Sequence, residues 1–343
     1  HFSLTPGLLD SRSGEMLMFG GEAYDGRELT FYSDLYRIDL HQVHEDRALP
    51  WEKLYSSAPQ IFGPEARSSH QSVAWGSFVY IFGGEWSSRD QRRYRQFNDL
   101  WRIKVTTPGA RWECLEATRA PPPRSGHRMA AGPAGQAVLY GGFCEDRRRR
   151  ATYMGDLHAL DLESATWCPL EVHGDRRSSR PGPRAGCLLW MSSGCTYIFG
   201  GVRPKRKGSE QLETMEDLWR ARMDRAQKEG VQWELLLAEG VGPGRRSGLC
   251  HCALSSTHPG RRLVFGGVLD VQLPASAAGT SARKGSPGGT EVALFHSDLF
   301  LLDCETGRAP VWTRLWPSPL TGRAARMPSP SALPAELQLH GGG

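Results

Sequence analysis

The chain of 343 residues has no apolar run near the roughly 20 residues needed to cross a bilayer. Its longest apolar runs, such as Phe78 to Phe82 and Gly186 to Met191, have the length of a buried strand. It also has little excess charge, because 42 Lys and Arg against 37 Asp and Glu leave a net charge of +5. So small an excess does not make nucleic acid the expected partner. These absences predict a globular protein without a membrane span.

No positively charged, apolar leader precedes the eight cysteines, so we expect reduced thiols in an intracellular compartment, the cytoplasm or alternatively the nucleus. Because residue 1 is His and not Met, we expect a fragment of a longer chain. Glycine and proline, in contrast, are abundant: 40 Gly and 23 Pro lie between short apolar runs. This composition favours many short strands joined by turns.

A strand that ends in Gly-Gly recurs along the chain, with 58 to 75 residues between successive copies. A fixed period of this length indicates a repeat architecture. The first five pairs are Gly20 and Gly21, Gly83 and Gly84, Gly141 and Gly142, Gly200 and Gly201, and Gly266 and Gly267; a sixth, weaker copy ends in Gly341 and Gly342.

Two further features follow each of the first five pairs in the same order. A second strand opens with Asp-Leu and an aromatic residue or His, and a third begins near a tryptophan: Trp51, Trp112, Trp167, Trp233 and Trp312. A proline-rich turn and an Arg-Ser or Arg-Ala start then follow in four copies, at Arg67, Arg124, Arg184 and Arg246. Three features in fixed order define one structural unit.

Each unit predicts a four-stranded antiparallel sheet that is too small to be stable alone and must stack on its copies. Two successive glycines in a strand indicate a sharp turn or a close approach of neighbouring backbone. One Trp in each unit is large enough, at ~200 Å² of surface, to fill the wedge between adjacent sheets.

The Phe-Gly-Gly, Asp-Leu-Trp, Trp and Arg-Ser-Gly-His series resembles kelch repeats, which implies an all-β, kelch-type β-propeller with one four-stranded antiparallel blade in each repeat. We expect one propeller over residues 1–343 with six radial positions, the last blade (Met327 to Gly343) being incomplete; the alternative is five blades plus a tail. Gly83-Gly84-Glu85 and Arg124-Ser125-Gly126-His127 are most similar to the kelch-domain-containing protein 4 family. That resemblance implies an intracellular protein with no assigned enzymatic activity.

Strands numbered one to four from the axis outward place the 2–3 and 4–1 loops on one face. The five 2–3 loops hold 12 to 30 residues, so this face is elaborated. The longest contains an insert at 269–295, rich in Ala, Gly, Ser and Pro, which we expect to be a flexible loop.

Basic residues gather in the second and third of these loops, each with a net charge of +2. We expect them to form a basic sector that steers an acidic protein or peptide partner; solvated side chains and RNA are the alternatives. The candidate partner-binding residues are Arg92, Arg93 and Arg95 in the second loop and Arg147, Arg148, Arg149 and Arg150 in the third.

The recurring Arg67, Arg124, Arg184 and Arg246 leave two interpretations open. They either tie the 4–1 turns together through backbone carbonyls or form a ring for a carboxylate-bearing ligand. We include them among the candidate partner-binding residues. The recurring His70 and His127 predict a structural role, because a catalytic pair needs asymmetric partners.

Cys250-His251-Cys252 is the most metal-like string, but the two thiols share a strand face that the imidazole does not, so we expect buried core cysteines and no metal. The sequence has no Gly-rich phosphate loop, no Gly-x-Ser-x-Gly elbow and no copper-binding Tyr and His set. We therefore predict no catalytic residues and no cofactor.

Together these features predict a non-enzymatic protein-interaction module that binds a partner through its 2–3 and 4–1 loops. A substrate-recognition subunit of a ubiquitin-ligase-type assembly is one alternative. A metal-dependent propeller oxidase or hydrolase is the other.

Overall fold

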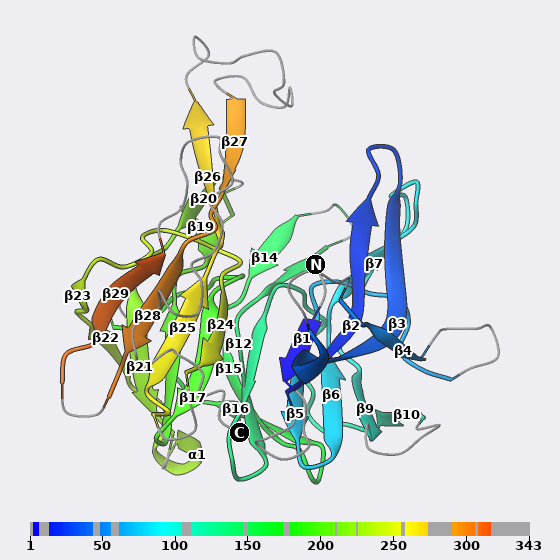
Figure 1. Cartoon of the computed structure of the whole chain (residues 1–343), viewed down its shortest axis with the longest axis horizontal. Coiled ribbons are helices and arrows are strands. Elements are labelled where there is room, and N and C mark those ends of the chain that lie inside the picture. The colour runs from blue at the N-terminus through cyan, green and yellow to red at the C-terminus, as the bar shows by residue number, and fades with distance from the viewer. Residues whose placement is uncertain are drawn as a thin grey trace.

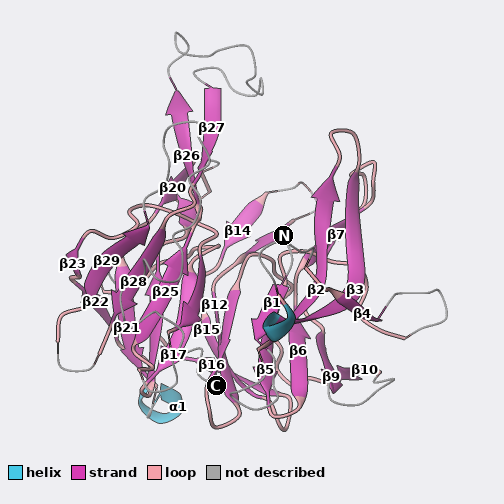
Figure 2. Ribbon diagram, in the orientation of Figure 1, coloured by secondary structure: helices cyan, strands magenta, loops and turns pink. Residues whose placement is uncertain are grey.

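The computed structural model of the chain describes residues 3–6, 14–43, 49–55, 62–104, 111–146, 148, 150–173, 179–206, 208–209, 211–223, 226–254, 258–273, 290–305 and 308–316. Strands dominate these residues, and they build a succession of five antiparallel blades (Figures 1 and 2). Among the described residues, the helices are η1 (Leu40–Gln42) and α1 (Ala226–Glu229). No helix in the described ranges has the length and apolar character that crossing a membrane requires.

The first three blades follow the chain, each with its innermost strand first. Blade one contains β1 (Ser3–Pro6), β2 (Glu15–Tyr24), β3 (Leu29–Asp39) and β4 (Glu52–Tyr55). Blade two contains β5 (Gln71–Trp75), β6 (Phe78–Phe82), β9 (Leu100–Lys104) and β10 (Trp112–Leu115). Blade three contains β11 (Arg128–Ala131), β12 (Gln136–Tyr140), β15 (Leu157–Asp161) and β16 (Thr166–Leu170).

The last two blades repeat this order. Blade four contains β17 (Leu188–Ser192), β18 (Cys195–Phe199), β21 (Leu218–Arg222) and β22 (Trp233–Leu236). Blade five contains β24 (Cys250–Ala253), β25 (Arg261–Phe265), β28 (Leu299–Asp303) and β29 (Val311–Trp316), with β23 (Glu239–Gly240) added in parallel on the outer edge of β29.

A two-stranded ribbon extends each blade beyond its Gly-Gly turn. In blade one the ribbon is the continuation of β2 and β3, where Gly21 to Tyr24 pair with Leu29 to Tyr32. The other four ribbons are β7 (Glu85–Ser87) with β8 (Tyr94–Gln96), β13 (Phe143–Glu145) with β14 (Ala151–Tyr153), β19 (Val202–Pro204) with β20 (Leu212–Thr214), and β26 (Val268–Leu273) with β27 (Thr290–Phe295). They rise from the same side of the blades, whereas α1 lies at the opposite side (Figure 1).

The all-β, four-stranded antiparallel architecture predicted from the repeats is confirmed. The five blades match the alternative of five blades plus a tail. The residues expected to form a sixth position, Met327 to Gly343, lie outside the described residues.

The expectation that 269–295 is one flexible loop is wrong at both of its ends. Leu269 to Leu273 lie in β26 and Thr290 to Phe295 form β27, and the two strands pair over their whole length. Alternating residues such as Val271 and Val292 give these ends strand character, which the overall composition of the insert concealed. Residues 274–289 lie outside the described residues.

The hydrophobic core lies between the blades. Four clusters join consecutive blades, from one and two through to four and five. In β6, Tyr80 and Phe82 pack toward blade three, whereas Ile81 packs toward blade one. This alternation follows from the period of two along a strand, and it makes both faces of an inner blade apolar.

The recurring tryptophans occupy these joints. Trp167 packs on Phe82 of the preceding blade with ring centroids 4.8 Å apart, and Trp312 packs on Phe199 at 5.0 Å. The pairs of Trp112 with Phe19 and Trp233 with Tyr140 are equivalent. Each Trp therefore covers the aromatic residue that precedes the Gly-Gly turn of the blade before it, while Trp51 in blade one is only half-buried.

Candidate interaction face

The Gly-Gly turns connect each blade to its ribbon, and their backbone explains why no other residue fits. Gly83 and Gly84 have φ of +68° and +96°, a region that side chains disfavour. A Cβ on Gly84 would lie 2.6 Å from the carbonyl oxygen of Ser68, and one on Gly83 would lie 2.7 Å from Cε1 of His127. Close approach of the 4–1 turns is thus the physical reason for the glycine pairs.

A buried arginine fastens the Gly-Gly turn in each of blades two to five. The Arg67 guanidinium is fully buried, donates to Gly83 O at 3.1 Å and forms a bidentate pair with Asp99 at 2.6 and 2.9 Å. The same contacts join Arg124 to Gly141 O and Asp156, Arg184 to Gly200 O and Asp217, and Arg246 to Gly266 O and Asp298. Each Asp is the one that opens the Asp-Leu strand of the same blade.

In blades two and four, the Trp after Asp-Leu donates a further hydrogen bond to the Asp of this Arg–Asp pair. Trp101 Nε1 donates to Asp99 at 2.6 Å, and Trp219 Nε1 donates to Asp217 at the same distance. Burial alone would raise the pKa of Asp217, but the hydrogen bonds and charge of Arg184 outweigh it and hold that pKa below its usual range. The pKa values of the other three Asp partners are lowered as well, so all four carboxylates are charged at neutral pH.

This geometry corrects the inclusion of the four recurring arginines among partner-binding residues. Their exposed fractions are 0% for Arg67, Arg124 and Arg184 and 6% for Arg246. Charge-assisted bidentate hydrogen bonds occupy each guanidinium from within its own blade. Of the two interpretations that the sequence left open, the observed contacts agree with the tie between turns. The Asp partners were missed, although the separation of 32, 32 and 33 residues in blades two to four was a visible signal.

Beneath the ribbons, backbone hydrogen bonds join one blade to the next. Gly126 N donates to Ser69 O at 3.1 Å, Gly186 N to Gly126 O at 2.9 Å, and Gly248 N to Gly186 O at 2.9 Å. These residues occupy the same position in the Arg-Ser-x or Arg-Ala-x turns of blades two to five. We call this chain of contacts the inner arc, and it fixes the relative positions of the turns from which the ribbons start.

Side chains also connect neighbouring ribbons. Gln96 at the end of β8 donates to Ser125 Oγ at 2.7 Å and to Phe143 O at 3.1 Å, and its Oε1 accepts the Glu145 N–H at 2.8 Å. Its amide thus substitutes for a strand along the edge of β13. The ribbons of blades two and three are therefore held as one surface at their base.

The predicted basic sector is placed on these ribbons, and the structure shows which charges remain accessible. The Arg92 side chain is 86% exposed, and its Nε forms a long, solvent-exposed ion pair with Asp90 at 3.7 Å. Arg93 is exposed beside the ring of Trp86, at 5.8 Å from its centroid. Arg95, in contrast, is bound to Glu65 at 2.6 Å.

In the third loop, Arg150 is bound to Asp146 at 2.7 Å, and Arg148 is exposed. Arg147 and Arg149 lie outside the described residues. Local acidic partners thus take up part of the charge that the sequence count assigns to the sector, and Arg92, Arg93 and Arg148 are the clearest described candidates for contact with a partner.

The Cys250-His251-Cys252 string is placed on the innermost strand of blade five. His251 Nε2 lies 3.1 Å from Leu189 O, and burial lowers the pKa of His251 to about 4. Cys250 and Cys252 point to the other side and are exposed, so the expectation that they are core residues is wrong. They face the side where no further described blade packs. Across the described ranges, no group of three or more His, Cys, Asp or Glu is arranged to hold a metal.

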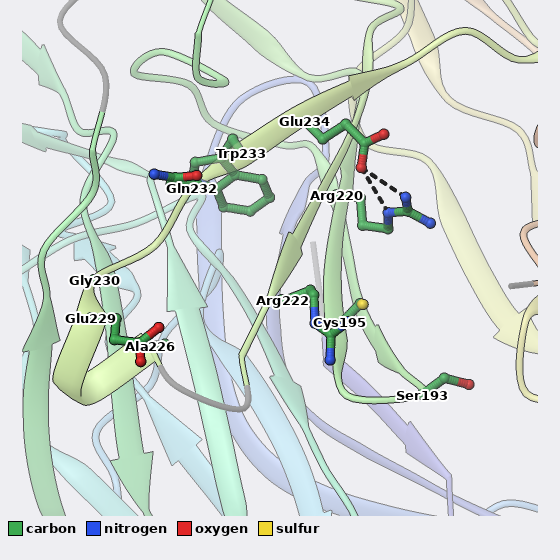
Figure 3. A pocket seen from close by; sticks show the side chains of 10 residues that line it. All are labelled: Ser193, Cys195, Arg220, Arg222, Ala226, Glu229, Gly230, Gln232, Trp233 and Glu234. Atoms are coloured by element: carbon green, nitrogen blue, oxygen red, sulfur yellow. Dashed lines mark hydrogen bonds and ion pairs between the residues drawn. The ribbon is translucent and has the colours of Figure 1, made fainter. Parts of the chain in front are cut away.

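A cavity of about 770 Å³ lies at the ends of the blade-four strands away from the ribbons, beside α1 (Figure 3). Its lining includes Arg220, Arg222, Glu229 and Glu234, so charges of both signs face it. Arg220 and Glu234 pair at 2.7 Å, which satisfies much of that charge internally (Figure 3).

Comparisons with known proteins agree with this architecture. Residues 7–201 match the KLHDC2/KLHL20/DRC7 Kelch-repeats domain. Host cell factor 1 of Rattus norvegicus is 26% identical over 259 residues, covering 70% of this chain and 12% of the relative. Host cell factor 2 of Homo sapiens is 25% identical over 322 residues, covering 88% and 36%. The Kelch domain-containing protein 10 homolog of Drosophila melanogaster is 27% identical over 200 residues, covering 54% and 30%.

A solved structure titled "Structure of YjhT" superposes with a TM-score of 0.53 at 14% identity, covering 87% of this chain and 83% of that one, and shows the fold alone. The chain spans only 12% of the host cell factor 1 sequence that it matches, and about a third of host cell factor 2, at 36%.

Four-stranded blades with Gly-Gly turns and a recurring Trp at each joint define a kelch-type β-propeller. The chain belongs to the KLHDC2/KLHL20/DRC7 kelch-repeat family. The finer resemblance to the kelch-domain-containing protein 4 family stays a prediction.

Proposed function

We propose that the chain is a non-enzymatic protein-interaction module that binds an acidic protein or peptide through its ribbon face. The observation that carries this proposal is the set of five ribbons, one from each blade, that rise from one side on a rigid base. Loops that a rigid scaffold positions are the usual carriers of binding. The kelch-repeat family and its relatives named above support an interaction role.

The class of partner follows from the exposed cations. Arg92, Arg93 and Arg148 project from neighbouring ribbons, and positive charge on one face raises the rate of encounter with acidic surfaces. No disulfide joins any of the eight cysteines, all of which lie in the described residues, and this supports the proposal of a reducing, intracellular location.

The test compares two charge-reversal variants of equal net charge. The ribbon variant changes Arg92, Arg93 and Arg148 to Glu, and the control changes Lys104, Arg111 and Arg308, which are exposed near or in the 3–4 connections, to Glu. Immobilised wild type and both variants are used to capture proteins from a cell extract, which mass spectrometry identifies.

We expect a set of acidic proteins on the wild type and the control that is missing from the ribbon variant. They should elute as the Debye length falls from about 8 Å to about 3 Å with added salt. Identical captured sets on all three proteins would exclude the ribbon face as the binding surface, and turnover of a small-molecule substrate by the purified chain would exclude the non-enzymatic role.

A further inference from the structure

One arginine of the innermost strands has no acidic partner, and its position is unusual. Arg128 is the first residue of β11 and pairs in register with Tyr140, the residue before the Gly141-Gly142 turn. It therefore lies at the ribbon end of blade three. Its side chain is half-buried beside the inner arc, next to blade four.

Backbone carbonyls are the only acceptors that this guanidinium has among the described residues. Arg128 Nε donates to Cys187 O at 2.7 Å and Nη1 donates to His127 O at 3.3 Å. No described carboxylate lies within the 4.0 Å that defines an ion pair. A guanidinium has five N–H donors in a planar fork, so most of its bonding capacity is unused.

Other half-buried arginines of the described residues show what is missing. A carboxylate binds five of them: Arg37 with Glu52, Arg102 with Glu113, Arg203 with Glu213, Arg220 with Glu234 and Arg261 with Asp303. Besides Arg128, only Arg262 among the described half-buried arginines has no such partner, and it donates to Met191 O at 3.0 Å. Arg262 pairs with Ala253 at the end of blade five away from the ribbons.

A cation that is partly removed from water without a counter-charge is costly for the fold. Burial indeed lowers the pKa of Arg128, although an arginine keeps its charge at neutral pH. Replacement by an apolar side chain of similar length would remove this cost. A purely structural explanation therefore accounts poorly for arginine at this position.

We propose that Arg128 receives the carboxylate of an acidic side chain on a protein partner that docks on the ribbon face. This inference rests on the proposed function and assigns its central ionic contact. The planar fork matches a carboxylate bidentately, and partial burial strengthens the pair relative to one at the rim. Arg92, Arg93 and Arg148 on the surrounding ribbons attract the partner, and Arg128 holds it.

The test uses an amidated hexaglutamate peptide as the probe, so that only side-chain carboxylates are present. Its affinity for the full chain is measured by fluorescence anisotropy at low ionic strength, together with urea unfolding of each protein. The variants are Arg128→Met, which keeps the aliphatic stem, and the matched Arg262→Met, which removes the other carboxylate-free arginine at the opposite end.

We expect Arg128→Met to bind hexaglutamate roughly tenfold more weakly or worse, because a charge-assisted pair is lost. Its resistance to urea should be unchanged or increased, and Arg262→Met should bind as the wild type does. A structural role for Arg128 predicts the reverse, namely lower resistance to urea with unchanged affinity, and that result would overturn the inference.

Two further outcomes separate this inference from the proposed function. If the ribbon variant loses capture while Arg128→Met retains full hexaglutamate affinity, the ribbon face stands and the assignment of Arg128 is wrong. If hexauridylate binds the wild type as tightly as hexaglutamate and also depends on Arg128, the site recognises polyanions in general, and the assignment to an acidic side chain is overturned.

Discussion

The Arg–Asp pairs of blades two to five combine burial with full charge, so the fold is sensitive to substitution of either residue. The Arg184 guanidinium is fully buried and depends on Asp217 for its only charge partner among the described residues. Breaking a buried pair by removing one member leaves an uncompensated charge. Replacing a single atom in one of these four Arg–Asp pairs should therefore have a large effect on the free energy of unfolding.

We predict that Asp217→Asn lowers the free energy of unfolding by about 3 to 5 kcal/mol at pH 7. The folded pKa of Asp217 is lowered, so its stabilisation is present above the unfolded pKa of about 4 and is lost as the pH falls through the folded value. Urea unfolding as a function of pH measures both effects. Glu234→Gln, which breaks the more exposed Arg220 pair of the same blade, should cost under about 1 kcal/mol, and an equal cost for both variants would contradict the prediction.

Buried histidines give a second pH dependence, of different origin. His70 is 2% exposed, and burial, followed by the charge of Arg67, lowers its pKa to about 3. Since the unfolded chain binds the proton at about pH 6.5, stability should fall as the pH drops from there toward 3. Blade five has Leu249 at the position equivalent to His70, so leucine is a side chain that this position of a blade accepts.

We predict that His70→Leu flattens the loss of stability between pH 6.5 and 4, by up to about 1.4 kcal/mol per pH unit. Cys187→Leu, at the equivalent position of blade four, serves as the control because it removes no histidine. Unfolding midpoints in urea across this pH range provide the measurement. An unchanged slope in His70→Leu would show that this imidazole titrates normally.

At the scale of elements, the ribbons work as a surface only if their bases are fixed. Gln96 supplies the link between the second and third ribbons, and its Oε1 is an acceptor for the Glu145 N–H. We predict that Gln96→Ala speeds hydrogen exchange at Glu145 without changing exchange in blade four. Gln211→Ala, an exposed glutamine on the fourth ribbon, should leave Glu145 protected, and protection that survives in Gln96→Ala would mean that this link is dispensable.

The elements also show what could be predicted from sequence. The regular recurrence of Gly-Gly, Asp-Leu and Trp was enough to predict the four-stranded blades, because local backbone strain and apolar alternation recur with the same period. The ribbon strands were not predicted, since pairs such as Val202 with Thr214 lie in polar segments without clear alternation. The role of Arg128 was invisible because the sequence shows a charge but not the absence of its partner.

At the scale of the whole molecule, the described blades form a series with two unlike ends. The residue before Gly-Gly faces the next blade, and it is buried in Phe82 (0% exposed) and Phe199 (2%), whereas Phe265 of blade five is 37% exposed. Met18 on the outer face of blade one is half-buried, while its equivalent Ile81 is fully buried. Because each blade gains stability from its neighbours, a face without one contributes less.

We predict from this difference that Phe199→Ala lowers the free energy of unfolding by about 3 to 5 kcal/mol, because it empties the joint that Trp312 fills. Phe265→Ala should cost less, about 1 to 2 kcal/mol, since that ring is 37% exposed in the described structure. Both rings precede a Gly-Gly turn and lie in the second strand of their blades, so each controls for the other. Urea unfolding of the wild type and the two variants under identical conditions measures the two losses of unfolding free energy. Equal costs would show that another segment or a second molecule covers the outer face of blade five, because a ring that is partly in water stabilises the fold less than a fully buried one.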